Sequence, residues 1–420
     1  MDQINKPYIS FHKVLGIVAI FFIGAGFIDG VTYWIFGSVG LLPIVYLPKI
    51  AVFACMMLQI FVWLKYGLPK QHLIITFLFL FFCIIGVLSQ EYINRVPVGL
   101  NPFIPFLFGI IAYNGIFPKW EKSFAKLSFY VILLVSFGAF LDIFTNVPWK
   151  NFSANFGDIS VQGSKVWEQG DFERVSGFTR ISSCLGIQIL ACCLIYHIYG
   201  SNNFLKFFVW LLSLVIIFFS TAKTVLIVSA FFLGAFFVKF FVTRVKKKNF
   251  MRSLPLIACF IGILLPVLAY IFNFGERFGL NPYAIALLGS FFVRIFETWP
   301  RMINHVIKDG SFIFGTGIGS SSSVLSPYPD YFMVDNAYVW LFGVMGLTFI
   351  PLLLLWIKYI RKLEIFESKR DMFFLFFAIF FFVNGITDNS EDNPILSFIT
   401  GLSLSHFRYR NYAKTINNNS

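Results

Sequence analysis

The sequence predicts an all-α polytopic membrane protein, and three observations support this fold class. Of the 420 residues, 58% are hydrophobic and only 13% are charged, whereas soluble domains carry about 25% charged residues. Phe alone supplies 58 residues. Apolar segments recur along the whole chain, so residues 1–420 are expected to form a single integral membrane domain. A soluble core could not bury so much apolar surface, and a disordered chain would be far more polar.

The length of the apolar segments predicts about twelve transmembrane helices. A helix needs about 20 apolar residues to cross a hydrocarbon core of roughly 30 Å. The first apolar run begins at Val14 and lacks a small-residue cleavage site, so it is expected to be a span and not a cleaved signal peptide. The predicted spans are 14–34, 43–64, 72–89, 100–117, 124–145, 180–199, 204–220, 224–243, 254–273, 336–357, 372–387 and 394–407.

The distribution of charge predicts the orientation. If the N-terminus is cytoplasmic and the spans alternate, the inner side holds 22 of the 33 Lys and Arg residues but only 5 of the 20 Asp and Glu residues. This is the bias of the positive-inside rule, so both termini are expected to be cytoplasmic. The bias also explains the net charge of +13, and a nucleic-acid partner is therefore not expected.

Two connections are much longer than the others, and both are predicted on the outer side. They are residues 146–179 and residues 274–335, and they hold most of the outer basic residues. The positive-inside rule works against basic residues in this position. An anionic ligand at the outer membrane face would explain why they are kept.

The first long loop ends in RVSGFTR, residues 174–180. Arg174 and Arg180 carry planar guanidinium groups that suit phosphate oxygens, and Gly177 would allow close approach of the backbone. Alternatively, these arginines lie at the membrane interface and reach lipid phosphates.

The second long loop contains a predicted amphipathic helix over about residues 282–308, with Pro300 expected to kink it or to start a second helix. Polar residues at spacings of three and four share one face, while the apolar face could lie on lipid or against the spans. The alternative is an interfacial helix with a solvated polar face. The polar positions are Arg294, Glu297, Arg301, His305 and Lys308, and Arg277 precedes the helix.

Further candidates lie at the borders of the spans. The segment GTGIGSSSS (315–323) could wrap an anion, although it lacks the P-loop pattern. Asp335 and Asn336 lie where the chain re-enters the membrane, and Asp335 could either pair with a loop arginine or act as a base. Lys223 lies at the tip of a tight outer turn, where it could cap a helix or reach the same anion.

The residues predicted on the outer side suit a diphosphate substrate. Only His305 of the five histidines faces outward, so a zinc site is not expected, and neither a metal nor another cofactor is predicted. Arginines could neutralise the charge of a diphosphate leaving group, while one acid takes a proton from the attacking hydroxyl.

Together these features resemble the bacterial O-antigen polymerases, within the O-antigen polymerase and ligase superfamily. The resemblance rests on about twelve spans, two enlarged outer loops and a series of loose motifs in a fixed order over about residues 174–347. The motifs are RVSGF, the turn S-T-A-K-T, Ser290-x-x-x-Arg294-x-x-x-x-Trp299, GTGIGSS, Asp335-Asn336-Ala337-Tyr338 and Gly343-x-x-Gly346-Leu347.

The resemblance implies a metal-independent glycosyltransferase of the C type in the bacterial inner membrane, with periplasmic loops. Its substrates would be undecaprenyl-diphosphate-linked oligosaccharide repeat units, which it polymerises into a surface polysaccharide such as O-antigen. Membrane lipids and a chain-length regulator protein are the further partners implied. The expected catalytic residues are Asp335 and Arg294, and the expected substrate-binding residues are Arg174, Arg180, Lys223, Arg277, Arg301, His305, Asn336 and Tyr338.

Two departures bear on the type of enzyme. Lys223 stands where the superfamily often has Arg, and Asp335-Asn336 stands where its ligases have His-Asn. The second departure favours a polymerase over an O-antigen ligase. The alternative from another class is a flippase for lipid-linked oligosaccharides, which also has about twelve spans but would line a central cavity with charge.

Overall fold

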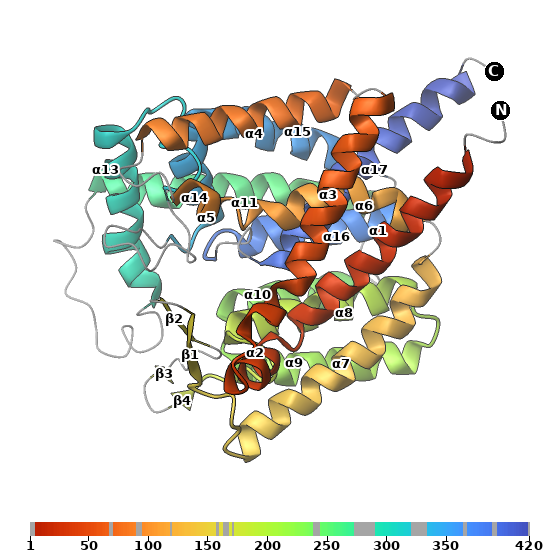
Figure 1. The fold of residues 1–420 in the computed structure, drawn as a ribbon, viewed down its shortest axis with the longest axis vertical. Helices are drawn as coiled ribbons and strands as arrows, with labels where there is room; N and C mark the ends of the chain where they lie inside the picture. The colour runs from red at the N-terminus through yellow and green to blue at the C-terminus, as the bar shows by residue number, and fades with distance from the viewer. Residues whose placement is uncertain are drawn as a thin grey trace.

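The computed structural model has the helical architecture of a multi-pass membrane protein (Figure 1). Among the residues that it describes, six helices are long and apolar enough to cross a membrane, or seven if one bent pair counts as a span. The described residues are 5–66, 70–89, 95–117, 120–156, 159–162, 168–169, 172–237, 244–272, 290–320, 334–363, 368–388 and 393–418.

The helices follow the order of the predicted spans. The N-terminal part comprises α1 (Asn5–Gly26), α2 (Asp29–Ser38), the 3-10 turn η1 (Leu42–Tyr46), α3 (Leu47–Tyr66), α4 (Lys70–Ser89), α5 (Arg95–Gly99), α6 (Phe103–Ile116) and α7 (Glu121–Phe144). The C-terminal part comprises α8 (Ser182–Tyr199), α9 (Asn203–Ser220), α10 (Lys223–Phe237), α11 (Arg244–Phe272), the π-helical turn η4 (Arg294–Thr298), α13 (Trp299–Asp309), α14 (Ala337–Met345), the 3-10 turn η6 (Gly346–Thr348), α15 (Phe349–Ile360), α16 (Lys369–Asn384) and α17 (Pro394–Asn418).

The first predicted span is not one straight helix, and this part of the prediction is wrong. Helices α1 and α2 meet at 80°. The break is held by contacts distant in sequence: the backbone N–H of Gly30 donates to the carbonyl of Phe178, and the backbone N–H of Arg180 donates to the Asp29 carboxylate. Hydropathy could not reveal the bend, because the residues that fix it lie about 150 positions away.

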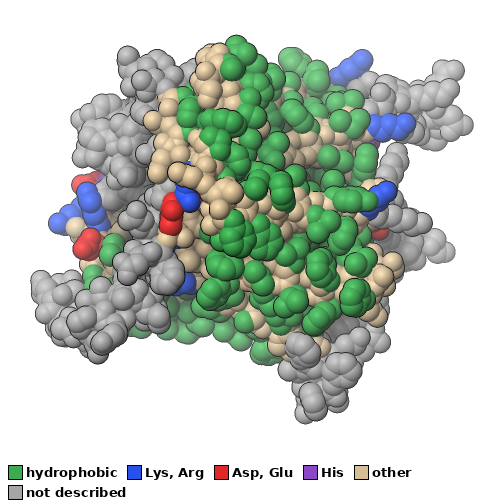
Figure 2. All heavy atoms as spheres, turned by 90° about the horizontal axis from the view of Figure 1, so that it is seen from below, with side chains coloured by type: hydrophobic (Ala, Val, Ile, Leu, Met, Phe, Trp, Pro, Cys, Tyr) green, Lys and Arg blue, Asp and Glu red, His purple; other side chains and the backbone are tan. Residues whose placement is uncertain are grey.

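The molecule has two polar ends separated by an apolar middle. Figure 1 places α13 and the strands at one end and both termini at the other; we call these the loop end and the terminal end. On the face drawn in Figure 2, hydrophobic side chains cover the middle, while most charged side chains gather at the two ends. This is the distribution that a bilayer requires, because charge at its centre costs several kcal/mol.

The long loop of residues 146–179 contains short strands that the sequence analysis did not predict. Strand β1 (Ser153–Phe156) pairs antiparallel with β2 (Ile159–Gln162), and β3 (Glu168–Gln169) pairs with β4 (Phe172–Glu173). Two such hairpins leave the fold class helical. They give the first loop an ordered frame at the loop end (Figure 1).

The phenylalanine-rich helix α16 lies inside the bundle. Its residues from Phe373 to Phe382 are all buried, as expected for a helix that is apolar around its whole circumference. It contacts α8, α10, α11, α15 and α17. Because α16 is packed on all sides, its last residues are fixed at the loop end, where they support the candidate site.

Close helix contacts depend on small residues. A side chain added at Gly109 of α6 would lie 2.1 Å from the carbonyl oxygen of Phe398, and one added at Gly401 of α17 would lie 2.0 Å from that of Phe106. Glycine at such positions lets two membrane helices approach until their backbones touch. The α6–α17 pair thereby forms a rigid part of the body.

The amphipathic helix of the second long loop is confirmed over its described part, and its apolar face packs against protein. Residues 282–289 lie outside the described residues, while residues 290–309 form an unbroken helical run in which the π-helical turn η4 precedes Pro300 of α13. Trp299, Met302 and Val306 are fully buried, and they pack against α11 and α14. The helix is therefore docked on the bundle.

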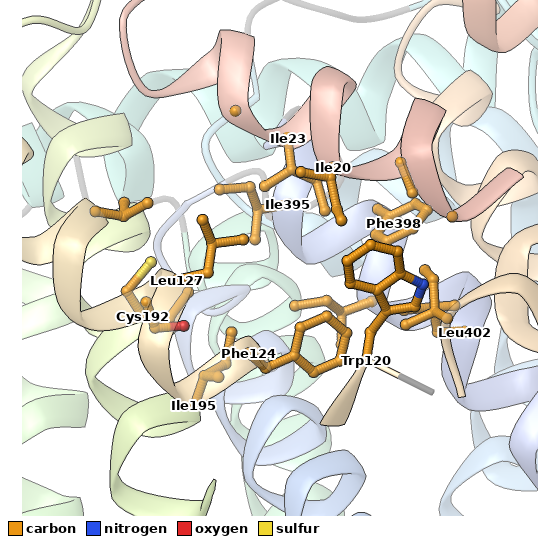
Figure 3. Close-up of a pocket in the computed structure, with 18 of the residues that line it drawn as sticks. Ile20, Ile23, Trp120, Phe124, Leu127, Cys192, Ile195, Ile395, Phe398 and Leu402 are labelled. Carbon is orange, nitrogen blue, oxygen red and sulfur yellow. The ribbon is translucent and has the colours of Figure 1, made fainter. Parts of the chain in front are cut away.

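An apolar cavity of about 120 Å³ lies between α1, α7, α8 and α17. Figure 3 shows Ile20 and Ile23 of α1 facing Leu127 of α7, with Cys192 of α8 at the side. Its lining is almost entirely hydrocarbon. Apart from Ser128 and the Trp120 indole, its lining side chains offer little for chemistry or for moving a charged sugar.

The two polar ends, combined with the charge bias of the sequence, lead us to expect a particular outcome of a topology experiment. Residues 160 and 320 belong to the loops of the loop end, and residue 418 ends α17 at the terminal end. Alkaline phosphatase fusions after residues 160 and 320 should be active in the periplasm. A green fluorescent protein fusion after residue 418 should fluoresce, since that protein matures in the cytoplasm. Opposite signals from residues 160 and 320 would contradict the fold.

Candidate anion-binding site

Three cationic side chains from separate segments meet at the loop end. They are Arg174, which precedes the turn of the first long loop, Lys223, the first residue of α10, and Arg294 of η4. Burial and the charge of Arg294 lower the pKa of Arg174. Burial and the charges of Arg174 and Arg294 lower the pKa of Lys223. These effects indicate that the three cations lie within range of one another's charge. We call these three residues the cation cluster.

Hydrogen bonds next to Arg174 and Lys223 fix the positions of their segments. The backbone N–H of Val175 donates to the carbonyl of Phe219 at 3.3 Å, which ties the segment of Arg174 to the end of α9. The hydroxyl of Thr224 bonds to that of Thr387, which ties the start of α10 to the end of α16. The backbone is therefore fixed both before and after Lys223.

Asp335 supplies the negative charge that faces the cluster. Nε and Nη2 of Arg294 lie 3.1 and 2.9 Å from Oδ2 of Asp335, and both side chains keep a fifth to a third of their surface exposed. The ion pair joins the two expected catalytic residues across 41 positions of sequence. It also means that Asp335 pairs with a loop arginine, as the simpler of the two interpretations held.

Asn336 and Tyr338 use their polar atoms to build the fold. Asn336 is completely buried; its Oδ1 accepts from the backbone N–H groups of Tyr338 and Val339, both at 2.9 Å, and thereby caps α14. Its Nδ2 donates to the carbonyl of Ile386 at 2.8 Å. The Tyr338 hydroxyl donates to the carbonyl of Phe382 at 2.7 Å. Both residues position Asp335 and offer no group to a ligand, although we expected them to bind substrate.

The turn of RVSGFTR is fixed by a buried acid that the sequence analysis did not assign. Oδ2 of Asp142 accepts from the backbone N–H groups of Ser176 and Gly177 at 2.8 and 2.9 Å. Gly177 has a φ of +59° and lies against the backbone of Ala139, so the close approach expected of this glycine is to the protein itself. The indole N–H of Trp149 donates to the Gly177 carbonyl at 2.7 Å. Asp142 lies within a predicted span, and an acidic residue in an apolar segment indicates that its carboxylate has a hydrogen-bonding partner.

A lysine completes this anchor. Nζ of Lys150 lies 3.0 Å from both Asp142 and Glu173. Burial alone would lower the pKa of Lys150, but hydrogen bonds and charges from Glu173 and Asp142 raise it above its usual value. Lys150 therefore stays charged, and its ammonium group is engaged by Asp142 and Glu173 within the fold. Glu173 directly precedes Arg174 in the sequence.

The two arginines of RVSGFTR have different neighbours. The guanidinium of Arg180 lies 4.2 Å from the centre of the Tyr33 ring, and its backbone N–H donates to Asp29. Arg174 belongs to the cation cluster. The turn at Gly177 therefore separates the two side chains that the spacing in sequence suggested would act together.

The remaining expected site residues lie farther along the second loop. Arg301 is exposed on α13, and Nδ1 of His305 lies 2.9 Å from Oδ2 of Asp309 within the same helix. Arg277 lies outside the described residues. Of the ten expected site residues, the structure thus brings Arg174, Lys223, Arg294 and Asp335 together.

The glycine-rich segment is used by the fold over its described part, residues 315–320. The backbone N–H groups of Thr316 and Gly317 donate to the carbonyls of Gly343 and Val344, and that of Ile318 donates to the carbonyl of Phe82. These donors join the loop to α14 and α4, so they are not available to an anion. The interpretation of this segment as an anion wrap is therefore wrong for residues 316–318.

No protein-family model matches the sequence, and the curated proteins and solved structures compared with it contain no match.

The cluster can bind an anion with more than one negative charge. Asp335 pairs with Arg294, and like charges held near one another in a partly buried place repel. Guanidinium groups accept phosphate oxygens in pairs, whereas an ammonium acts as a point charge. A diphosphate would satisfy all three. One further acid is near: Asp388 follows Thr387 directly and bonds to Asn384 at 3.5 Å.

The structural role of Asn336 predicts a stability difference between two caps. Asn202 caps α9 through the same pair of backbone bonds, but it is exposed. Asn202→Ala should lower the free energy of unfolding by about 1 kcal/mol. Asn336→Ala should lower it by about 3 kcal/mol, because the buried donor bond to Ile386 is also lost. Thermal unfolding of the purified proteins in detergent measures both, and equal losses would contradict the assignment.

Proposed function

We propose that the protein polymerises oligosaccharide repeat units carried on undecaprenyl diphosphate, at the periplasmic face of the bacterial inner membrane. In this proposal about twelve helices cross the membrane, both termini are cytoplasmic, and the loop end faces the periplasm. The observation that carries the proposal is the convergence of Arg174, Lys223 and Arg294 beside Asp335 at one polar end of an apolar body. A lipid-linked diphosphate brings its charge to that depth of the membrane.

The proposed step transfers the growing chain from its lipid diphosphate to the next unit. A hydroxyl of the incoming unit attacks the anomeric carbon of the growing chain, and the bond from that carbon to the diphosphate oxygen breaks. The diphosphate leaves with the bonding electrons, and the cation cluster stabilises its charge. The proton of the hydroxyl passes to a carboxylate.

Asp335 is the proposed acceptor of this proton. Its carboxylate is bound to Arg294 while the site holds no diphosphate. A diphosphate would compete for that guanidinium and release one oxygen of Asp335 for the attacking hydroxyl. The ion pair thus holds the carboxylate in place until the substrate arrives.

Two alternatives differ in what they would require of the molecule. An O-antigen ligase would use a similar cation cluster but a different acceptor, so the polysaccharide itself must distinguish the two. A flippase would need polar groups along a path through the bundle. The apolar lining of the internal cavity (Figure 3) and the position of the cluster at one end favour surface chemistry.

Arg294→Ala should abolish long polysaccharide chains while single capped units persist, because transfer loses on the order of 10²-fold in rate with one charge-stabilising donor. Arg294→Lys keeps the charge without the fork and should leave short chains. A gel of surface polysaccharide from a deletion strain that carries each variant is the measurement. Lys308→Ala removes one exposed charge from α13 and serves as the matched control with normal chains.

The same gel distinguishes the alternatives. Loss of all attached units in the deletion strain would indicate a ligase, and units trapped inside the cell would indicate a flippase. Asp335→Asn should behave like Arg294→Ala. If Asp388→Asn stops polymerisation while Asp335→Asn does not, the proton acceptor is Asp388 and the role of Asp335 is wrong.

A further inference from the structure

A second, larger cavity lies on the other side of α14 from the cation cluster. Its volume is about 470 Å³, and it is lined by residues of α4, α6, α14, α15, α16 and α17. Trp340 and Val344 of α14 face it, whereas Val339 of the same helix packs against Trp299 and Met302 of α13. Helix α14 therefore separates this groove from the side on which η4 and α13 lie.

The lining of the groove presents mainly apolar surface, because the serine and threonine hydroxyl groups in it are bonded to backbone carbonyls. Among its lining residues, Ser397 donates its hydroxyl proton to the carbonyl of Pro102 at 3.1 Å, and Thr400 donates to the carbonyl of Leu396 at 2.8 Å. The surface presented to an occupant is thus mainly hydrocarbon. Apolar space of this size within a membrane suits a hydrocarbon chain, since burying each methylene is worth about 0.8 kcal/mol.

The groove extends toward the terminal end. Ile318 lines it near the glycine-rich segment, while Tyr359 and Phe407 line it near the end of α15. The rings of Tyr359 and Phe407 stack with centroids 5.5 Å apart. The occupant that fits is therefore long and runs along the membrane helices.

Basic residues stand at this terminal end of the groove. Leu352, Leu355 and Tyr359 of α15 line it, and Lys362 lies in the turn that follows the helix, where its backbone N–H donates to the Tyr359 carbonyl. Nζ of Lys362 lies 5.9 Å from the centre of the Tyr359 ring. Lys358 and Lys362 are both exposed. The segment from Lys358 to Asp371 contains five basic and three acidic residues, so it is net positive.

We propose that the groove binds an anionic phospholipid of the membrane leaflet at the terminal end. One acyl chain lies between α4 and α15, and the phosphate of the headgroup lies against Lys358 and Lys362. Basic pockets between membrane helices on this side bind the headgroups of anionic lipids. The site is at the opposite end of the molecule from the cation cluster, so it does not rest on the proposed glycosyl transfer.

The test is native mass spectrometry of the purified full chain with added lipid. Phosphatidylglycerol and phosphatidylcholine with identical acyl chains are the two probes. The wild-type protein should retain one phosphatidylglycerol in preference to phosphatidylcholine. Lys358→Gln with Lys362→Gln should weaken that binding by about 25-fold, at about fivefold for each charge. Leu352→Trp should fill the groove and remove both lipids.

Matched variants keep the test specific. Lys13→Gln removes an exposed charge from α1, and Leu211→Trp adds the same bulk on the exposed face of α9; both should bind phosphatidylglycerol like the wild type. Equal binding of the two phospholipids, or unchanged binding in the double lysine variant, would overturn the proposal. Equally tight binding of undecaprenyl phosphate, independent of the lysines, would assign the groove to a substrate tail and also overturn it.

Discussion

Repulsion between like charges is the constraint on which the loop end depends. Burial and the charge of Arg294 lower the pKa of Arg174, and burial with the charges of Arg174 and Arg294 lowers the pKa of Lys223. Such an arrangement costs free energy in the absence of a ligand. It persists because hydrogen bonds fix the segments of Arg174 and Lys223, and the ion pair with Asp335 holds Arg294. Binding a multivalent anion would return that free energy, which makes the cluster suited to a ligand with two or more negative charges.

The helical body supplies the fixed points for this arrangement. Helix α16 is packed on all sides, and the turn that follows it holds Thr387 against Thr224 and Ile386 against Asn336. Asn336 then fixes the start of α14 and thereby the neighbouring Asp335. The buried Asp142 holds the turn that follows Arg174. Side chains that are uncharged or paired within the fold thus set the positions of the charged site residues. A substitution that destabilises the helical body would therefore also displace the site.

Much of the fold could be predicted from the sequence, because a bilayer imposes a length and a polarity on each helix. Every predicted span overlaps at least one helix, although only six or seven of the described helices are long and apolar enough to cross a membrane. The bend between α1 and α2 and the hairpins of the first loop could not be predicted. They depend on partners far away in sequence, such as Arg180 for Asp29.

The types of residue in the site could be predicted from the sequence, but which of them contact one another could not. The arginines of the two long loops do lie at the loop end, and Arg294 and Asp335 do form an ion pair. Which arginines share a site could not be read from spacing, because the turn at Gly177 sends Arg174 and Arg180 to different neighbours. Asn336 and Tyr338 looked like ligand-binding groups because nothing in the sequence reveals that their partners are the backbone of α16.

The most direct test of the central claim is the affinity of the purified protein for undecaprenyl diphosphate in lipid nanodiscs. Arg174→Gln combined with Lys223→Gln removes two cations of the cluster and leaves the ion pair of Arg294 and Asp335 intact. Each charge-assisted hydrogen bond contributes about 1.5–3 kcal/mol, so the double variant should bind the lipid more than about 100-fold more weakly than the wild type. A control with Lys308→Gln should bind normally. Equal affinity of the double variant and the wild type would contradict the claim that this cluster holds a lipid diphosphate.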